Sequence, residues 1–440
     1  MAAAFVLLLL LGGCAYLTPE PSNAAVVPTA TRSPEPTPSN TPQPLPTRVD
    51  PNAPITLTLW LPPEMVLSEE ESPGSPIVRA WNAHYLAAHS RVRLNLVPKA
   101  AYGPGGIVSM VLATQPVVPA RLPDVIVFDT AELPRLAEAG VLQPLDDALP
   151  ASLWQGMYPF AVDAVTLDGQ RLGVPYHADV DVLAYDRDMV PEPPETWDAL
   201  LTMRQEDEQP PTLIFPATGS DGSAADAFMV HYLALGGRLT EENGRPFLDS
   251  GIAARILRSY RSAMDAGIVP EAVRRLRTRE DCWGAFLDGG ASLAGTTARL
   301  YHQDQALAAG IGYAPLPTMG TEMATVARSW AWGVTTRDPT KRDLAVEYIT
   351  TALEAERVAA WATATGYVPT QREVLPAVIE DAPYRRFLGD QMEQARPYPR
   401  LKDYGAIQAA VVRAIEDVLD GLATPERAAI TAAASVMRLR

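Results

Sequence analysis

Hydrophobic positions in the first third of the chain alternate between strand-like and helix-like spacing. β-Branched and apolar residues alternate over residues 55–60, apolar and polar residues alternate over 92–96, and 124–129 is a nearly continuous apolar run. These patterns predict two half-buried strands and one strand buried on both faces. After Ser75, a predicted N-cap, apolar residues recur every four positions, and helical spacing returns before Gly140. This order of strands and helices predicts a doubly wound α/β lobe.

The middle of the chain changes character. Asp168-Gly169 lies between two short apolar runs and predicts a tight β-hairpin, and residues 182–185 predict a further strand. Beyond these the spacing becomes mostly helical, with short strands predicted at 212–215, 291–297, 311–314 and 330–335 and with helices dominating from residue 341. An early α/β lobe is therefore expected to be followed by a more helical region.

The start of the chain has its own pattern. An apolar run over residues 2–11 stops at Gly12-Gly13-Cys14, and it is shorter than the roughly 20 residues needed to cross a bilayer. It predicts the core of a signal peptide. The Leu-Gly-Gly-Cys spacing resembles a bacterial lipobox, which implies a lipid on Cys14. No Lys or Arg precedes the run, unlike most secretory signals, and a buried strand or helix that ends in Gly-Gly-Cys is the alternative.

Residues 15–54 are rich in Pro and Thr and poor in bulky apolar side chains. Such a segment cannot bury a core, so it predicts a semi-stiff tether. The remaining length exceeds what one hydrophobic core usually organises, and two lobes are expected.

Charge and composition exclude several classes of partner. The net charge of −16 argues against binding to nucleic acid or to bare anionic lipid. With Cys14 lipidated, Cys282 has no partner for a disulfide, and its apolar surroundings predict a small buried side chain. The five histidines are dispersed without a metal-binding motif, so neither a metal nor a cofactor is expected.

A series of short motifs follows the tether in a fixed order. They are Leu-Thr-Leu-Trp at 57–60, Leu-Pro-Asp-Val-Ile-Val at 122–127, Leu-Ala-Glu-Ala-Gly-Val-Leu-Gln-Pro-Leu-Asp at 136–146, Asp-Gly-Gln-Arg-Leu-Gly-Val-Pro-Tyr at 168–176, Val-Leu-Ala-Tyr-Asp-Arg-Asp at 182–188, Pro-Pro-Glu-Thr-Trp-Asp-Ala-Leu at 193–200, Gly-Tyr-Ala-Pro-Leu-Pro at 312–317, Ser-Trp-Ala-Trp-Gly-Val at 329–334, Ala-Val-Glu-Tyr-Ile at 345–349 and Gly-Tyr-Val-Pro at 366–369. Together they resemble the extracellular solute-binding proteins of bacterial ABC importers, in the carbohydrate-binding family that includes maltose-binding protein.

The resemblance implies an α/β fold of two lobes, the type II periplasmic-binding-protein fold, with a helix-rich C-terminal part and a ligand cleft between the lobes. The first lobe would comprise residues 55–180 and 328–366, and the second 181–327 and 367–440. Three departures leave the ligand open. Tyr185-Asp186-Arg187 replaces the usual Tyr-Asn-Lys, and the loop over 62–74 is long and acidic. The strand after Gly290, which in the family is commonly rich in Met and Thr and followed by an aromatic residue, reads Ser-Leu-Ala-Gly-Thr-Thr-Ala-Arg at 292–299.

The implied function is that of a non-catalytic receptor. It would be held by its lipid on the outer face of the cytoplasmic membrane, in the periplasm or at the cell surface. As a monomer it would bind a carbohydrate and deliver it to the permease subunits of an ABC transporter.

Ligands of open α/β sheets lie beyond the carboxyl ends of the strands. Trp60 ends the first predicted strand, and Asp129 with Thr130 ends the third, so these three are candidate ligand-binding residues. The alternatives are a core position for Trp60 and a helix cap for Asp129.

By family analogy, further candidates lie near the crossovers between the lobes. Trp330 and Trp332 are two apart in a strand and so share a face, where one could be a sugar platform or both could be core residues. His177 could instead be a hydrogen-bonded structural histidine. The full set of these candidates is Tyr176, His177, Asp179, Asp181, Arg299, Tyr301, Trp330, Trp332 and Tyr367.

Other function classes remain open on the sequence alone. An exported glycoside hydrolase would need paired carboxylates, for which Asp129 and Asp179 are the candidates. A receptor for a non-sugar solute, such as glycerol phosphate or a polyamine, or a subunit that presents ligand to a membrane kinase are further alternatives.

Overall fold

The computed structural model describes residues 53–66, 72–203, 211–219, 221–304, 310–320 and 325–439. The predicted signal peptide, the lipobox cysteine and nearly all of the tether lie outside these residues. None of the helices in the described ranges combines the length and the apolar character needed to cross a membrane.

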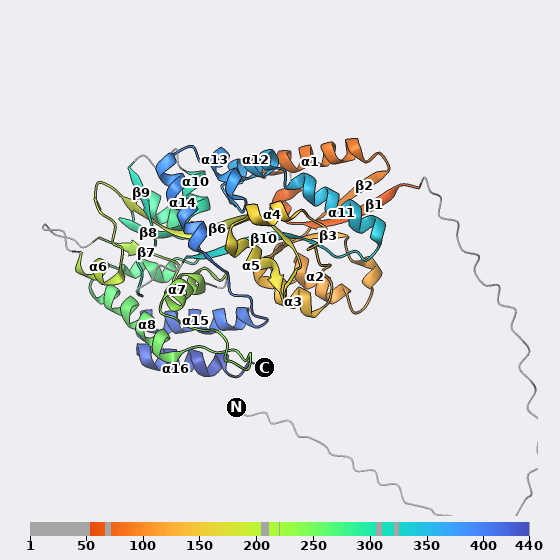
Figure 1. Cartoon of the computed structure of the whole chain (residues 1–440). Coiled ribbons are helices and arrows are strands. Elements are labelled where there is room, and N and C mark those ends of the chain that lie inside the picture. The colour runs from red at the N-terminus through yellow and green to blue at the C-terminus, as the bar shows by residue number, and fades with distance from the viewer. Residues whose placement is uncertain are drawn as a thin grey trace, which may run out of the picture. The chain divides into compact units, whose positions relative to one another are not determined.

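One hydrogen-bonded sheet runs through both lobes, in the strand order β2-β1-β3-β10-β6-β8-β7 (Figure 1). Its strands are β1 (Ile55–Leu61), β2 (Val92–Pro98), β3 (Val125–Asp129), β6 (Val174–Asp186), β7 (Leu213–Ile214), β8 (Leu293–Thr297) and β10 (Val326–Val334). The short strands β9 (Ile311–Ala314) and β11 (Val368–Pro369) pair with β6, and β12 (Arg396–Pro397) pairs with β10. β1 pairs in parallel with β2 and β3, whereas β10 runs antiparallel to β3 and β6.

Helices cover the sheet in both lobes (Figure 1). Around β1, β2 and β3 lie α1 (Ser75–Ala88), α2 (Ile107–Thr114), α3 (Leu133–Glu138), α4 (Ala151–Gly156), α5 (Pro159–Val165), α11 (Pro339–Ala352) and α12 (Ala355–Thr365). Around β7, β8 and β9 lie α6 (Trp197–Thr202), α7 (Ser223–Ala234), α8 (Ser250–Asp265), α9 (Arg279–Leu287), α10 (Ala298–Gln303), α14 (Ala382–Gln394), α15 (Tyr404–Leu419) and α16 (Pro425–Val436). α13 (Leu375–Val378) follows α12.

Most predicted elements coincide with observed ones. The strands expected at 55–60, 92–96 and 124–129 are β1, β2 and β3. The Asp168-Gly169 hairpin joins β4 (Thr166–Leu167) to β5 (Gln170–Arg171), and φ is positive at both turn residues, 51° and 78°, as a type I′ turn requires.

Two local predictions are wrong in detail. Ser75 is the first residue of α1 and Gly74 is its N-cap, because the Gly74 carbonyl accepts the first helical hydrogen bond, from the Val78 N–H at 3.2 Å. The strand expected at 182–185 is the end of the 13-residue β6, whose first half carries polar residues that obscured the strand pattern.

The hydrophobic core divides into two clusters. Trp81, Trp332 and Trp361 lie in the cluster that includes the first lobe, and Phe228 and Tyr260 lie in the other. At the end of β6, Val182 and Ala184 lie in the first cluster and Leu183 lies in the second, since successive side chains of a strand point to opposite faces. The predicted boundary at residues 180 and 181 falls inside this strand, and the lobe boundaries stay a prediction.

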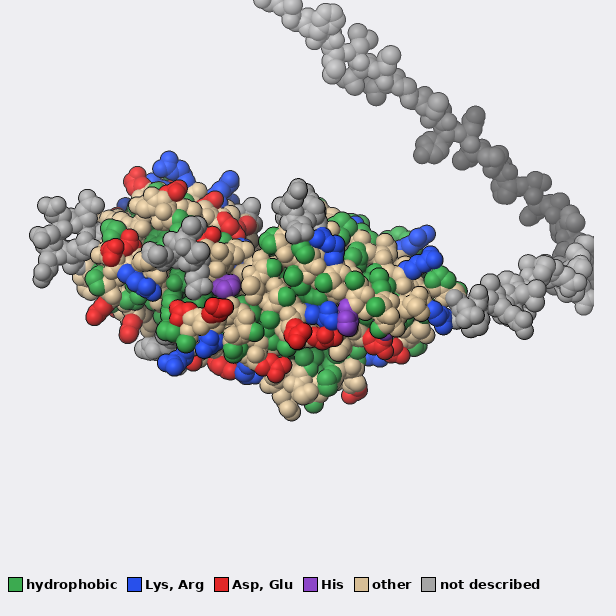
Figure 2. Space-filling view, turned by 90° about the horizontal axis from the view of Figure 1, so that it is seen from above, with side chains coloured by type: hydrophobic (Ala, Val, Ile, Leu, Met, Phe, Trp, Pro, Cys, Tyr) green, Lys and Arg blue, Asp and Glu red, His purple; other side chains and the backbone are tan. Residues whose placement is uncertain are grey.

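Charged side chains are spread over the surface. On the face shown in Figure 2, acidic and basic side chains are interspersed among apolar and neutral ones. The acidity of the chain is therefore not gathered into a single patch on that face.

Candidate functional site

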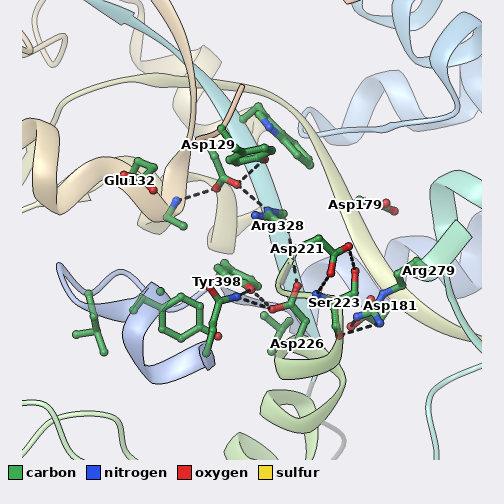
Figure 3. A pocket seen from close by; sticks show the side chains of 18 of the residues that line it. Asp129, Glu132, Asp179, Asp181, Asp221, Ser223, Asp226, Arg279, Arg328 and Tyr398 are labelled. Atoms are coloured by element: carbon green, nitrogen blue, oxygen red, sulfur yellow. Dashed lines mark hydrogen bonds and ion pairs between the residues drawn. The ribbon is translucent and has the colours of Figure 1, made fainter. Parts of the chain in front are cut away.

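A cavity of about 730 Å³ is lined by residues of both lobes and of the strands that join them (Figure 3). We call it the interlobe cavity. The first lobe contributes Tyr102, Asp129, Glu132 and Arg135. The second contributes Asp221, Ser223, Asp226, Arg279, Glu280, Arg299, Tyr404 and Gln408. The connecting strands and segments contribute Asp179, Asp181, Arg328, Trp330, Tyr367 and Tyr398.

Asp129 lies at the carboxyl end of β3 and is held from three sides. Its Oδ2 accepts hydrogen bonds from the Tyr102 hydroxyl at 2.8 Å and from Nε of Arg328 at 2.6 Å. Its Oδ1 accepts from the backbone N–H of Ala131 at 2.9 Å and so caps the 3-10 turn Thr130–Glu132. The cap that the sequence offered as an alternative role therefore coexists with a position on the cavity wall.

Arg328 is the central cation of the interlobe cavity. Its guanidinium lies 5.2 Å from the Tyr102 ring centre, 5.1 Å from that of Tyr398 and 5.9 Å from that of Trp330. Its Nη1 is 4.0 Å from Oδ2 of Asp226, on the opposite side from Asp129 (Figure 3). Arg328 thus bridges a carboxylate of the first lobe and one of the second.

Asp226 projects from the first turn of α7 into the cavity. Its Oδ1 accepts hydrogen bonds from the Tyr398 hydroxyl and from Nε2 of Gln408, the latter at 3.3 Å. Burial raises the pKa of Asp226 to about 7, although the guanidinium groups of Arg328 and Arg279 oppose the rise. This carboxyl group therefore changes charge near neutral pH.

We expect Asp226→Asn to remove a pH-dependent loss of stability. A carboxyl group whose pKa is higher in the folded than in the unfolded state does not change the free energy of unfolding at a pH below its unfolded pKa. It lowers the free energy of unfolding most at a pH above its folded pKa. Stability from this group therefore falls as the pH rises from about 4 to about 7. Between pH 5 and pH 8 the variant should gain about 2–3 kcal/mol in unfolding free energy relative to the parent, measured by urea denaturation. Asp147→Asn, at an exposed site, controls for the lost charge, and an equal gain at both pH values would contradict the expectation.

Two more carboxylates line the cavity from β6. Oδ1 of Asp179 accepts from the backbone N–H of Arg299 at 3.0 Å, and Oδ2 of Asp181 pairs with Nη2 of Arg279 at 2.6 Å. Burial raises the pKa of Asp179 to about 6 and raises that of Asp181, and the neighbouring arginines act in the opposite direction. Acidic and guanidinium groups therefore alternate around the cavity.

Several helices of the second lobe begin at this cavity. Ser223 starts α7, Arg279 starts α9 and Tyr404 starts α15, and all three line the wall. Helix N-termini carry a partial positive charge and N–H groups without helical partners. The helix N-termini therefore help to compensate the negative charge of the cavity wall, which holds more carboxylates than guanidinium groups.

Six of the sequence-predicted residues line the interlobe cavity: Asp129, Asp179, Asp181, Arg299, Trp330 and Tyr367. The structure brings these together from β3, β6, α10, β10 and the turn before β11. Tyr367 packs under the Arg299 guanidinium, 5.4 Å away, and beside Trp330, with the ring centres 5.2 Å apart.

The other six predicted residues do not line it. Trp60 is largely buried in β1, with Nζ of Lys99 4.9 Å from its ring centre, and the Thr130 hydroxyl donates to the carbonyl of Ser329 at 3.0 Å. Tyr301 is buried in a ring cluster with Trp283, Tyr313 and Tyr384.

The remaining three belong to a buried aromatic cluster that reaches the cavity wall through Tyr367. His177 accepts a hydrogen bond from Nε1 of Trp361 at 3.1 Å and stacks on Tyr367 with the ring centres 4.0 Å apart. Burial lowers its pKa well below the ordinary value, so the ring is neutral. Tyr176 and Trp332 are also buried, with their ring centres 5.4 Å apart.

Sequence reasoning missed several cavity residues. Arg328 precedes the strand predicted at 330–335, whereas the observed β10 begins at Val326, so that Arg328 shares a strand with Trp330. Asp226 is an acidic residue in an otherwise apolar, alanine-rich helix, an available signal. No sequence pattern predicted that Tyr102, Tyr398 and Gln408 would line the cavity.

Comparison with known proteins places the chain in a family. Residues 85–385 match the model of the bacterial extracellular solute-binding protein family. A probable ABC transporter-binding protein of Deinococcus radiodurans is 25% identical over 333 residues, which cover 68% of this chain and 76% of that protein. A maltotriose-binding protein of Pyrococcus abyssi is 32% identical over 78 residues, only 18% of this chain and 17% of that protein.

Solved structures share the fold. Maltose-bound MalE3 of T. maritima superposes with a TM-score of 0.70 at 20% identity, covering 88% of this chain and 100% of that chain. The cyclic alpha-maltosyl-1,6-maltose binding protein from Arthrobacter globiformis gives 0.71 at 22% identity, covering 88% and 98%. These matches confirm the predicted two-lobe type II fold. Because the family model spans more than half of its length, the chain belongs to the bacterial extracellular solute-binding proteins, a family that works outside the cytoplasm.

Proposed function

We propose that this protein is a lipid-anchored receptor that binds a carbohydrate in the interlobe cavity and delivers it to the permease of an ABC transporter. The observation that carries the proposal is the cavity wall itself, where carboxylates and guanidinium groups alternate beside the rings of Tyr102, Trp330, Tyr367 and Tyr398. No residue performs covalent chemistry in this scheme, and the protein acts as a monomer.

The wall has the chemistry that sugars require. Each hydroxyl of a sugar both donates and accepts a hydrogen bond, so it pairs with an adjacent carboxylate and guanidinium, such as Asp129 with Arg328 or Asp181 with Arg279. The apolar C–H faces of a sugar ring pack on aromatic side chains, for which Trp330 and Tyr367 are available. The similar proteins include a maltose-bound structure and a maltotriose-binding protein, which supports the same class of ligand.

Among the candidate residues, we assign direct ligand contact to Asp129, Asp179, Asp181, Arg299, Trp330 and Tyr367, with Arg328 and Asp226 added. Thr130, Tyr176 and His177 would hold these groups in place, and Trp60, Tyr301 and Trp332 would belong to the core. A ligand that contacts both lobes binds the closed form better than the open form and so shifts the population towards closure.

Isothermal calorimetry against a panel of sugars tests the proposal. The panel contains glucose, maltose, maltotriose and cellobiose, with glycerol 3-phosphate and spermidine as non-sugar solutes. We expect saturable binding of at least one sugar. Binding of a non-sugar solute alone would refute the carbohydrate assignment. Hydrolysis of a bound sugar would show that the protein is an enzyme.

Replacing the predicted lipidated cysteine should release the protein from the membrane. We expect Cys14→Ser to move the protein from the membrane fraction to the medium or the periplasm, because the lipid is its only proposed attachment. Immunoblotting of cell fractions measures the change. Cys282→Ala is the matched control, since Cys282 is fully buried. Retention of the Cys14→Ser protein in the membrane fraction would refute the lipid anchor.

A further inference from the structure

A small cavity lies in the second lobe, next to the Asp181–Arg279 pair. Its volume is about 30 Å³, and Trp197, His231, Tyr260 and Thr296 contribute to its lining. Asp181 and Arg279 line both this cavity and the interlobe cavity. A neighbouring pocket of about 10 Å³ shares Asp181 and His231 with it. We call these two spaces together the rear cavity.

Four polar atoms of residues that line the rear cavity have no hydrogen-bond partner in the part of the chain that the structure describes. Nε1 of Trp197, Nδ1 of His231, the Tyr260 hydroxyl and the Thr296 hydroxyl are buried and make no hydrogen bond within the described residues. The rings of His231 and Tyr260 lie 5.3 and 5.5 Å from that of Trp197. Several such groups are therefore gathered around one small space.

Buried polar groups in folded proteins almost always find a partner, because a buried donor or acceptor left unpaired loses its hydration without compensation. The partner here must accept at least one hydrogen bond, and a partner that also donates satisfies more of these groups. The indole N–H only donates, the hydroxyls do both, and the His231 ring is neutral because burial lowers its pKa to about 4, so one nitrogen accepts. The charges of Asp181 and Arg279 compensate each other, which leaves no net charge to attract an ion.

The size of the rear cavity matches water. A buried water needs about 10–15 Å³ of such space and makes two to four hydrogen bonds to polar walls. The larger pocket therefore has room for about two molecules and the smaller for about one.

We propose that the rear cavity binds a cluster of about three ordered water molecules that joins Tyr260, Thr296 and His231 to Asp181, and that these three are positioning residues for the interlobe cavity. A carboxylate accepts several hydrogen bonds, so Asp181 bonds to this water in addition to Arg279. The side chain that faces the ligand is then fixed from behind by water and not by protein atoms alone.

A high-resolution crystal structure of the full chain, with a second crystal pressurised with xenon, tests the water cluster. We expect density for water within hydrogen-bond distance of the Tyr260 and Thr296 hydroxyls and of the Asp181 carboxylate, and no xenon in the rear cavity. A dry apolar cavity takes up xenon. Xenon density there, or no density at all, would overturn the proposal.

Affinity tests the positioning role, and this arm alone rests on the proposed function. Tyr260→Phe keeps the ring but removes the hydroxyl, and we expect it to weaken maltotriose binding about fivefold, the effect of losing one ordinary hydrogen bond. Tyr85→Phe, whose hydroxyl donates to the Leu344 carbonyl in the first lobe, should leave affinity unchanged. Thr296→Val serves as a second variant.

A merely structural role would lower the midpoint of unfolding without changing the affinity of the folded molecules. Parental affinity in both Tyr260→Phe and Thr296→Val would therefore overturn the positioning role. If the parent protein binds no sugar, the proposed function fails, and the crystal structure still decides whether the rear cavity holds water.

Discussion

Arg328→Met lowers the unfolding free energy by about 3–5 kcal/mol and weakens sugar binding at least about 100-fold. Nε of Arg328 pairs with Asp129 at 2.6 Å, and the Asp129 side chain is only 2% exposed. Methionine fills a similar volume without charge, so it leaves a buried carboxylate with the Tyr102 hydroxyl and one backbone N–H as its partners. Removing one partner of a buried ion pair therefore lowers the free energy of unfolding strongly, because the other charge stays buried without compensation. Urea denaturation and calorimetry measure the two effects.

The double variant Arg328→Met, Asp129→Asn distinguishes the effect of the ion pair on stability from its effect on ligand binding. Removing the stranded charge should restore part of the stability but none of the affinity, because both groups line the interlobe cavity. Arg275→Met, at an exposed site outside the cavity, is the matched control and should behave like the parent. A single Arg328→Met variant as stable as the parent would show that Asp129 does not depend on this arginine.

Trp332→Ala should destabilise the protein by about 3–5 kcal/mol while leaving the affinity of the folded molecules unchanged. Trp332 is fully buried, and its ring lies between those of Trp81, Tyr176 and Tyr348 at centre distances of 6.4, 5.4 and 5.9 Å. Truncation opens a large cavity in this cluster, and urea denaturation measures the cost.

Trp330→Ala is the paired experiment. Trp330 is only partly buried and lines the interlobe cavity, so its loss should weaken binding much more than it weakens the fold. Equal effects of the two variants on both affinity and stability would contradict the assignment of one tryptophan to the cavity and the other to the core.

The strands and helices were largely predictable because their signals are local. The alternation at 55–60, the apolar run at 124–129 and the Asp168-Gly169 turn each depend on a few adjacent residues, and each matches an observed element. β6 was only half recognised, because the polar residues His177, Asp179 and Asp181 interrupt its apolar pattern. Those residues face a neutral aromatic stack and a polar cavity, so the strand did not need apolar side chains there.

The candidate site was predictable only in part. Asp129 could be placed because the carboxyl end of a parallel strand is a general position for ligand contact, and the structure puts it on the cavity wall. Trp60 satisfied the same rule but lies largely buried beside Lys99. The end of a strand predicts that a residue lies at the edge of the sheet. Whether its side chain faces a cavity or is buried depends on the segments that pack against it.

The sequence by itself determined the local elements, the acidic composition, the predicted anchor and the family to which the chain belongs. Only the tertiary structure decided that Arg328 lies between Asp129 and Asp226, that Trp330 lines the cavity while Trp332 is core, and that Asp181 has a small cavity behind it. These facts depend on segments far apart in the chain meeting where β6 and β10 join the lobes. Contacts of this kind are set by long-range pairing and burial, which leave no signal in the spacing of neighbouring residues.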